Sequence, residues 1–113
     1  MRYPVFFVLI TLAVLISTAG FAAQNQGATE IQIDGGKRGI VPFPHHAHQN
    51  RLSDCNTCHA VFPQEPQSLN KLKQAGQLKP KEVMNKQCVK CHRAEKKAGN
   101  PSGPTTCSKC HVR

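Results

Sequence analysis

The chain has 113 residues, which allows one small domain at most. Fifteen lysines and arginines against six aspartates and glutamates give a formal net charge of +9 at pH 7. Such a charge can indicate nucleic-acid binding, but the chain has no tryptophan and no aromatic platform on which bases could stack, so we expect no nucleic-acid partner.

The first 22 residues have the layout of a secretory signal peptide. Arg2 provides the positive charge, residues 5–16 are almost all apolar, and Gly20 and Ala22 are the small residues that cleavage after Ala22 requires. The apolar run is shorter than the roughly 20 residues that a membrane-spanning helix needs, so we expect cleavage rather than a retained anchor. The mature chain would then work outside the cytoplasm and would not span the membrane.

The next part of the chain predicts a lead-in and a β-hairpin. Residues 23–29 are small and polar, which is typical of a flexible lead-in to a domain over residues 30–113. Residues 31–33 alternate as a strand does, residues 34–39 contain three glycines and form a turn, and residues 40–43 return as a second strand.

Short helices are expected in the rest of the domain, because capping residues flank several polar stretches. They are predicted over residues 69–75, with Ser68 as the cap and Gly76 as the end, from Pro80 to Met84, and over residues 93–98, ended by Gly99.

Side chains for a hydrophobic core are scarce after residue 22. Phe43 and Phe62 are the only aromatic residues there. Ordering the backbone costs about 1–2 kcal/mol per residue, and buried apolar area returns roughly 25 cal/mol per Å². We therefore expect another element to hold the fold together, and the six cysteines are the obvious candidates.

All six cysteines occur in one pattern, Cys-x-x-Cys-His, which appears three times. This pattern is the attachment signature of c-type haem. The two thiols add to the two vinyl groups of the haem as thioethers, and the histidine that follows offers its imidazole to the iron. Three haems would supply the interior that the side chains lack. The predicted haem-binding residues are Cys55, Cys58, Cys88, Cys91, Cys107 and Cys110, and the predicted iron ligands are His59, His92 and His111.

Three other uses of the cysteines explain less of the pattern. Disulfides suit a secreted chain but do not require a histidine after every pair. A redox-active Cys-x-x-Cys is normally single and lies on a βαβ unit, and structural zinc in a Cys₄ site would leave the third pair unexplained. We therefore predict three covalent haem c groups in a small multihaem fold. That fold is mostly irregular, with a short N-terminal β-hairpin and a few short α-helices packed around the haems.

Three further histidines lie together in Phe43-Pro44-His45-His46-Ala47-His48-Gln49. Each haem iron takes six ligands, four from the ring and one from its motif, so three more ligands are needed unless some sites stay open. A histidine cluster can also be a surface tract or a weak metal site. Beside three haems, we expect at least two of these histidines to be axial ligands.

The motifs together resemble the class III cytochromes c, and most closely the triheme cytochrome c7 group, which is similar to four-haem cytochrome c3 with one haem removed. The resemblance rests on Phe-Pro-His-x-x-His-Gln before the first Cys-x-x-Cys-His and on the number and order of the motifs, and it covers residues 29–113. It implies that His45 binds the first haem opposite His59 and that His48 binds the second opposite His92. The i, i+3 spacing suits a helical turn, which directs both side chains to one side.

The chain departs from this family at the third haem. The family places its remaining distal histidine four residues before the second motif, where this chain has Met84, and no histidine lies between residues 60 and 91. Methionine also binds haem iron, and His/Met ligation raises the reduction potential. We therefore predict that Met84 binds the third haem opposite His111. The alternatives are His46 as the ligand and a five-coordinate iron.

The resemblance implies a periplasmic electron carrier that is not an enzyme, because the iron changes its oxidation state and no bond is made or broken. Its partners would be inner-membrane quinol oxidases or dehydrogenases and outer-membrane or terminal cytochromes, and we expect a monomer. The alternative is a haem-containing reductase, or its electron-transfer subunit, with one open haem site. A six-coordinate third haem favours the carrier, and carbon monoxide binding to the native ferrous protein favours the reductase.

Overall fold

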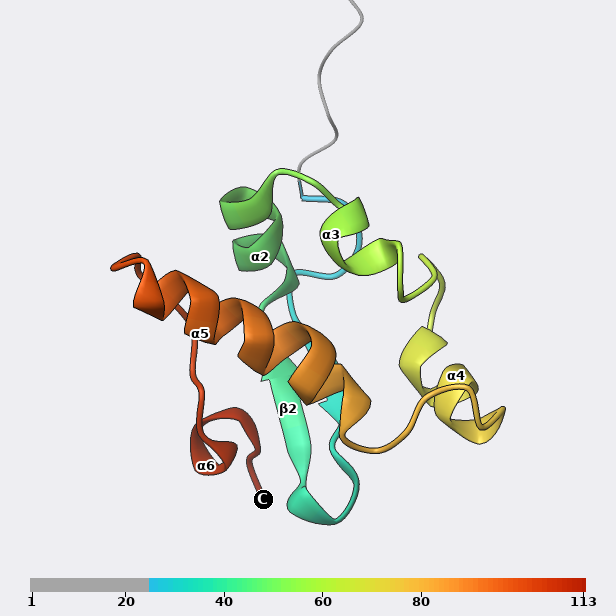
Figure 1. Cartoon of the computed structure of the whole chain (residues 1–113). Helices are drawn as coiled ribbons and strands as arrows, with labels where there is room; N and C mark the ends of the chain where they lie inside the picture. Colours follow the sequence, from blue (N-terminus) through green and yellow to red (C-terminus); the bar gives the residue numbers. More distant parts are fainter. Residues whose placement is uncertain (1–24) are drawn as a thin grey trace, which may run out of the picture.

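A computed structural model describes residues 25–113. The predicted signal peptide, residues 1–22, and the first two residues of the predicted lead-in lie outside the described residues. Figure 1 shows short helices arranged around one hairpin, which is the predicted fold class. The elements are β1 (Ile31–Asp34), the 3₁₀ turn η1 (Gly36–Arg38), β2 (Ile40–Phe43), α2 (His45–Leu52), α3 (Asn56–His59), α4 (Ser68–Gln74), the π-helix η2 (Met84–Cys88), α5 (Val89–Lys97) and α6 (Cys107–Cys110).

The predicted hairpin is confirmed. β1 and β2 pair antiparallel, with Ile31 opposite Phe43 and Asp34 opposite Ile40. The Asp34 carboxylate accepts a hydrogen bond of 2.8 Å from the Gly36 amide, which fixes the turn. Gly36 has a φ of 63°, a left-handed conformation that glycine adopts at little cost.

The C-terminus returns to this hairpin (Figure 1). The Ile40 amide donates to the Val112 carbonyl at 3.0 Å, and the Val112 amide donates to the Ile40 carbonyl at 2.8 Å. Because Val112 follows His111 directly, this bridge places the third motif against the start of the domain. No pattern in the sequence predicts this bridge.

The helices differ from the predictions mainly at their beginnings. α4 ends before Gly76, as expected, but it starts at Ser68, one residue earlier than predicted. Gln67 is the N-cap residue, and no side chain caps the helix. Ser68 is therefore the first helical residue rather than the cap. α5 begins at Val89, four residues before the predicted start, because the second motif is itself helical. It ends in a Schellman motif at Gly99, whose φ is 78°.

The segment that carries Met84 forms a π-helix rather than the expected α-helix. η2 covers Met84–Cys88 and continues directly into α5, so the two form one rod across the molecule (Figure 1). π-Helical turns are rare in proteins, and many of those known lie at functional sites.

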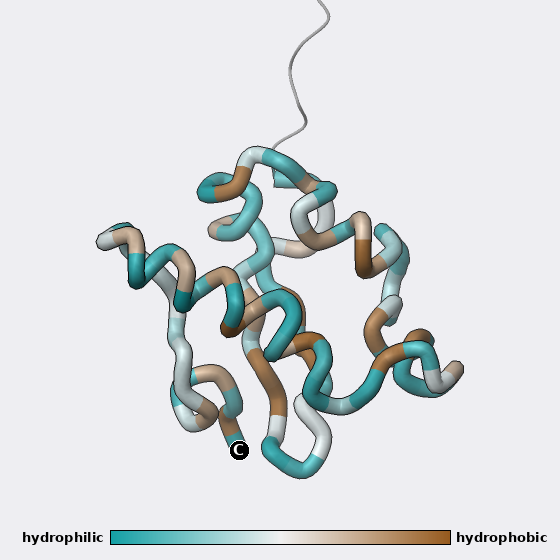
Figure 2. Tube along the Cα trace, viewed as in Figure 1, coloured by the Kyte–Doolittle hydropathy of each residue, from teal (hydrophilic) through white to brown (hydrophobic). Residues whose placement is uncertain are grey.

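Residues 25–113 form no core of their own. None of their side chains is fully buried, and Ile40, Val61 and Val112 are each about half exposed. Figure 2 shows the hydrophobic stretches along β2 and on the neighbouring turns of η2 and α5. This agrees with the expectation that the side chains alone are too few for a core. Within the same residues, no helix combines the length and the apolar composition that crossing a membrane would require.

Candidate haem-binding sites

The three Cys-x-x-Cys-His motifs each lie on one turn of helix. The first begins at Cys55, the N-cap residue of α3, and continues through α3. The second spans the junction of η2 and α5, and the third is in α6 and the residue after it. Cysteines three residues apart on a helix project from the same side. This local geometry lets one short segment present two thiols to the same edge of a planar ring.

α2 brings two histidines next to histidines of the motifs. The ring centres of His45 and His59 are 6.2 Å apart, with the rings at 85° to one another. The ring centres of His48 and His92 are 6.1 Å apart, with the rings at 30°. Two imidazoles that bind one metal ion from opposite sides have centres about 6 Å apart, because each metal–nitrogen bond is about 2 Å and the nitrogen lies about 1 Å from its ring centre. Both pairs therefore have the spacing that an iron between them requires.

The four paired histidines also share one hydrogen-bonding arrangement. In each ring Nδ1 donates to a backbone carbonyl, which leaves Nε2 available to a metal and fixes the ring orientation. The bonds join His59 to Phe62 at 2.8 Å, His92 to Pro104 at 2.7 Å, His48 to Pro44 at 2.9 Å and His45 to Ala28 at 3.1 Å.

His46 differs from its neighbours. Its Nε2, rather than its Nδ1, forms a hydrogen bond of 3.2 Å, and the partner is the Gly27 carbonyl. The nitrogen that the paired histidines leave available is therefore used in a contact with the N-terminal segment. This arrangement disfavours His46 as the ligand of the third haem.

The third motif is arranged in another way. His111 packs against Gly35 of the hairpin, and its Nδ1 is buried without a hydrogen-bond partner among the described residues. Met84 is half-buried at the start of η2. Burial raises the pKa of the Cys88 thiol, and the charges of the Cys58 and Cys110 thiols add to the rise. The pairing of Met84 with His111 stays a prediction.

Comparison with known proteins identifies the family. Residues 41–112 match the family described as cytochrome c7 and related cytochrome c. The chain is similar to cytochrome c7 of Geobacter metallireducens, with 33% identity over 106 residues that cover 94% of this chain and 97% of the relative. The chain belongs to the cytochrome c7 family. The resemblance inferred from the sequence is thereby confirmed.

Solved structures of the same family have the same fold. The solution structure of triheme cytochrome PpcA from Geobacter sulfurreducens matches with 31% identity and a TM-score of 0.55. PpcB, a cytochrome c7 from the same organism, matches with 28% identity and a TM-score of 0.53. Each match covers 76% of this chain and 100% of the solved chain.

Burial raises the pKa values of Cys58, Cys88 and Cys110, which favours the thiol form at these three positions. Within residues 25–113, no three side chains of histidine, cysteine, aspartate or glutamate lie close enough to hold a metal ion. A haem iron needs only two protein ligands, so the paired histidines fit haem better than they fit a free metal.

Two glycines lie directly against motif histidines. A Cβ atom on Gly103 would be 2.5–2.9 Å from atoms of the His92 ring, and a Cβ atom on Gly35 would overlap the His111 ring. Only glycine leaves room for either ring in its present position. Nothing in the local sequence distinguishes these two glycines from the turn glycines, so their contacts with the histidines were not predicted.

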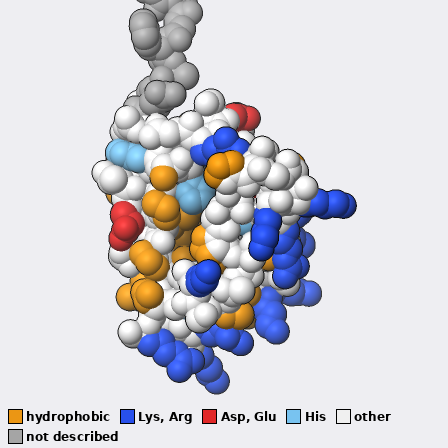
Figure 3. Space-filling model, turned by 90° about the vertical axis from the view of Figure 1, so that its left-hand side faces the viewer, with side chains coloured by type: hydrophobic (Ala, Val, Ile, Leu, Met, Phe, Trp, Pro, Cys, Tyr) orange, Lys and Arg blue, Asp and Glu red, His pale blue; other side chains and the backbone are white. Residues whose placement is uncertain are grey.

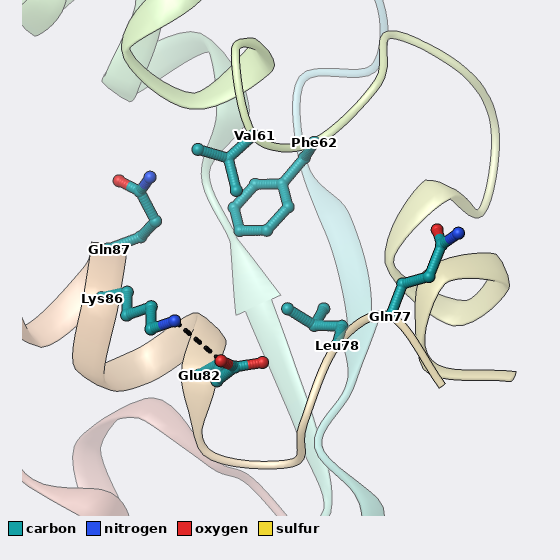
Figure 4. A pocket seen from close by; sticks show the side chains of 7 residues that line it. All are labelled: Val61, Phe62, Gln77, Leu78, Glu82, Lys86 and Gln87. Atoms are coloured by element: carbon teal, nitrogen blue, oxygen red, sulfur yellow. Dashed lines mark hydrogen bonds and ion pairs between the residues drawn. The ribbon is translucent and has the colours of Figure 1, made fainter. Parts of the chain in front are cut away.

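Two hollows border the motifs. The smaller, of about 160 Å³, lies between the segment after α3 and η2, with Val61, Phe62 and Leu78 toward it and the Glu82–Lys86 ion pair at its edge (Figure 4). The larger, of about 700 Å³, is open and lies beside Gly103, with Lys96 and Lys109 in its lining. An apolar lining suits the face of a macrocycle, and lysines suit its carboxylates.

Charged side chains connect the elements that carry the histidines. Arg51 of α2 forms an ion pair of 2.7 Å with Glu95 of α5, so the helices of His48 and His92 are joined directly. The hydrogen bond from Arg51, followed by that from Asn100, lowers the pKa of Glu95. Lysines and arginines gather along one side and the lower end of the face shown in Figure 3.

Proposed function

We propose that this cytochrome is a periplasmic electron carrier with three covalently bound haem c groups. The observation that carries the proposal is the pair of histidine–histidine distances, 6.2 and 6.1 Å, beside two of three Cys-x-x-Cys-His motifs. PpcA, which is similar over its whole length, is described as a triheme cytochrome. The periplasmic location rests on the predicted signal peptide.

The residues of each proposed site follow from the motifs. The six motif cysteines form the thioethers. The axial ligands are His45 and His59 for the first haem, His48 and His92 for the second, and Met84 and His111 for the third. The haem supplies an iron that alternates between the ferric and ferrous states.

The protein determines how readily each iron is oxidised and how close the sites are. His45 and His48 lie one turn apart on α2, so the first two sites are neighbours. The carbonyl acceptors at the four Nδ1 atoms make these imidazoles stronger donors, which favours the ferric state. The basic surface in Figure 3 supports acidic redox proteins as partners, because opposite charge speeds their encounter.

Haem counting tests the proposal. The full chain is exported in a bacterium that matures c-type cytochromes, and the product is analysed by pyridine haemochrome assay and mass. We expect three haems and cleavage after residue 22. The double variant Cys107→Ala/Cys110→Ala should lose one haem and keep the other two, and Ser108→Ala in the same motif should keep all three. A folded, colourless product of polypeptide mass contradicts the proposal.

Carbon monoxide distinguishes the carrier from a reductase. The native ferrous protein should bind none, because all three irons have two protein ligands. Binding of one equivalent by the unmodified protein would favour a reductase, or its electron-transfer subunit, with its open site on the third haem.

A further inference from the structure

The segment before the hairpin is held on α2. Residues 26–29, which we name the N-terminal strap, make four hydrogen bonds with the first five residues of that helix. They run from Gln49 Nε2 to the Gln26 carbonyl at 2.9 Å, between His46 Nε2 and the Gly27 carbonyl at 3.2 Å, from His45 Nδ1 to the Ala28 carbonyl at 3.1 Å, and from the His46 amide to the Thr29 carbonyl at 3.2 Å.

α2 needs such a contact because little else holds its first turn. A helix of eight residues is unstable alone in water, and the first amides of any helix lack partners within it. Pro44 occupies the N-cap position, and no side chain caps the helix. The Thr29 carbonyl accepts from the His46 amide and so takes over the function of a cap.

The strap also provides the acceptor for His45. A carbonyl that accepts from Nδ1 fixes the tautomer and the orientation of a ligating imidazole and raises its basicity. His48, three residues later, has no such dependence, because its Nδ1 donates to Pro44 at the start of α2. His45 and His48 therefore differ in whether the strap orients them.

We propose that the N-terminal strap is a positioning element for His45, and that it sets the ring orientation at the first haem and lowers the potential of that haem. The inference rests on the proposed function, because it requires His45 to be an axial ligand. The strap lies outside residues 41–112, where the chain matches the family. Within α2, His46 contributes two of the four bonds.

Gly27 offers a way to remove the strap without changing a ligand. Its φ is 74°, and a proline there is restricted to about −65°, so Gly27→Pro is incompatible with the observed backbone. Gly99→Ala is the matched control, because Gly99 has a φ of 78° but no atom within 4 Å of its added Cβ. The control introduces backbone strain at the end of α5, outside the strap and α2.

The test uses the oxidised triheme protein. Haem methyl resonances in the proton NMR spectrum report the axial ring orientation at each haem, and a redox titration followed by the same resonances gives each potential. In Gly27→Pro we expect the first-haem methyl shifts to move and the first-haem potential to rise, with the second and third haems unchanged. Gly99→Ala should leave all three haems as in the unmodified protein.

The outcomes separate the strap from the proposed function. If Gly27→Pro contains three haems, and its first-haem methyl shifts and potential match those of the unmodified protein, the proposed role of the strap is wrong. The proposed function is then unaffected. Fewer than three haems in the unmodified protein would overturn the proposed function. If Gly27→Pro does not mature, Gln49→Ala removes one strap bond, and it should move the same first-haem resonances by a smaller amount; no movement there overturns the strap as well.

Discussion

Two histidines of α2, His45 and His48, lie beside motif histidines at ring distances of 6.2 and 6.1 Å, whereas His111 of the third motif packs on a glycine of the hairpin. In the first region every paired ring donates through Nδ1 to a carbonyl. In the second region the corresponding nitrogen of His111 is buried without a partner among the described residues. The same motif is thus placed in two different environments.

This difference indicates that the potential of each haem depends on the residues around its motif rather than on the motif itself. An imidazole whose Nδ1 lacks an acceptor is a weaker donor to iron than one that has an acceptor. Methionine is also a weaker ligand for ferric iron than histidine, so Met84 would act in the same direction. Both features predict that the third haem has the highest potential of the three.

Substitution of Met84 should give the largest change in the difference between the third haem and the other two. Met84→His supplies the ligand that the family uses, and we expect the third-haem potential to fall by on the order of 0.1 V, within the span of about 0.8 V that axial ligands control. The other two potentials should stay unchanged. The measurement is a redox titration followed haem by haem.

Two further variants make this prediction specific. Asn85→His adds a histidine at the neighbouring exposed position and should change no potential. Met84→Ala should open one iron to carbon monoxide. If all three haems keep their spectra and potentials in Met84→Ala, Met84 is not a ligand.

Substitution of the glycines that touch motif histidines should give the next largest change, at one haem each. Gly103→Ala would press on the His92 ring and should change the spectrum of the second haem, whereas Gly35→Ala would press on His111 and change the third. We expect a destabilisation of roughly 1–3 kcal/mol from each, as for overpacked interiors. Thermal unfolding and haem-resolved NMR measure the two effects.

Gly99→Ala again serves as the reference, since nothing lies within 4 Å of its added Cβ. Equal changes at all three haems in Gly103→Ala would contradict a local contact with His92.

Much of the site could be predicted from the sequence because its chemistry is local. A motif of five residues fixes two thioethers and one ligand, and the hairpin follows from alternation around a glycine-rich turn. The prediction that Ser68 caps α4 was wrong, because Gln67 takes the N-cap position with a left-handed φ of 62°, which nothing in its side chain favours. α5 begins early because its first turn is the haem motif, whose helicity is not visible in propensities.

The contacts that could not be predicted join distant parts of the chain through the backbone. The bridge of Ile40 to Val112, the Pro104 carbonyl at His92 and the Ala28 carbonyl at His45 involve no distinctive side chain. Every residue offers the same carbonyl, and every residue except proline offers the same amide. Sequence patterns therefore identify the ligands but not the acceptors that tune them.

The smallest expected effect concerns the ion pair that joins α2 to α5. Arg51 lowers the pKa of Glu95 in the folded protein, so the pair stabilises the fold above the ordinary glutamate pKa, and this contribution is lost as the pH falls through the lowered value. Between neutral and acid pH, the melting temperature should therefore fall more in the unmodified protein than in Glu95→Gln. The difference should be small, because both side chains are largely exposed, at 55% and 39%.

Glu65→Gln is the control for this prediction. It removes a carboxylate whose partner, Lys71, lies on α4 rather than on a histidine-bearing helix, and it should leave the second haem unaffected at every pH. An acid dependence in Glu95→Gln equal to that of the unmodified protein would show that the pair does not connect the two histidine-bearing helices energetically.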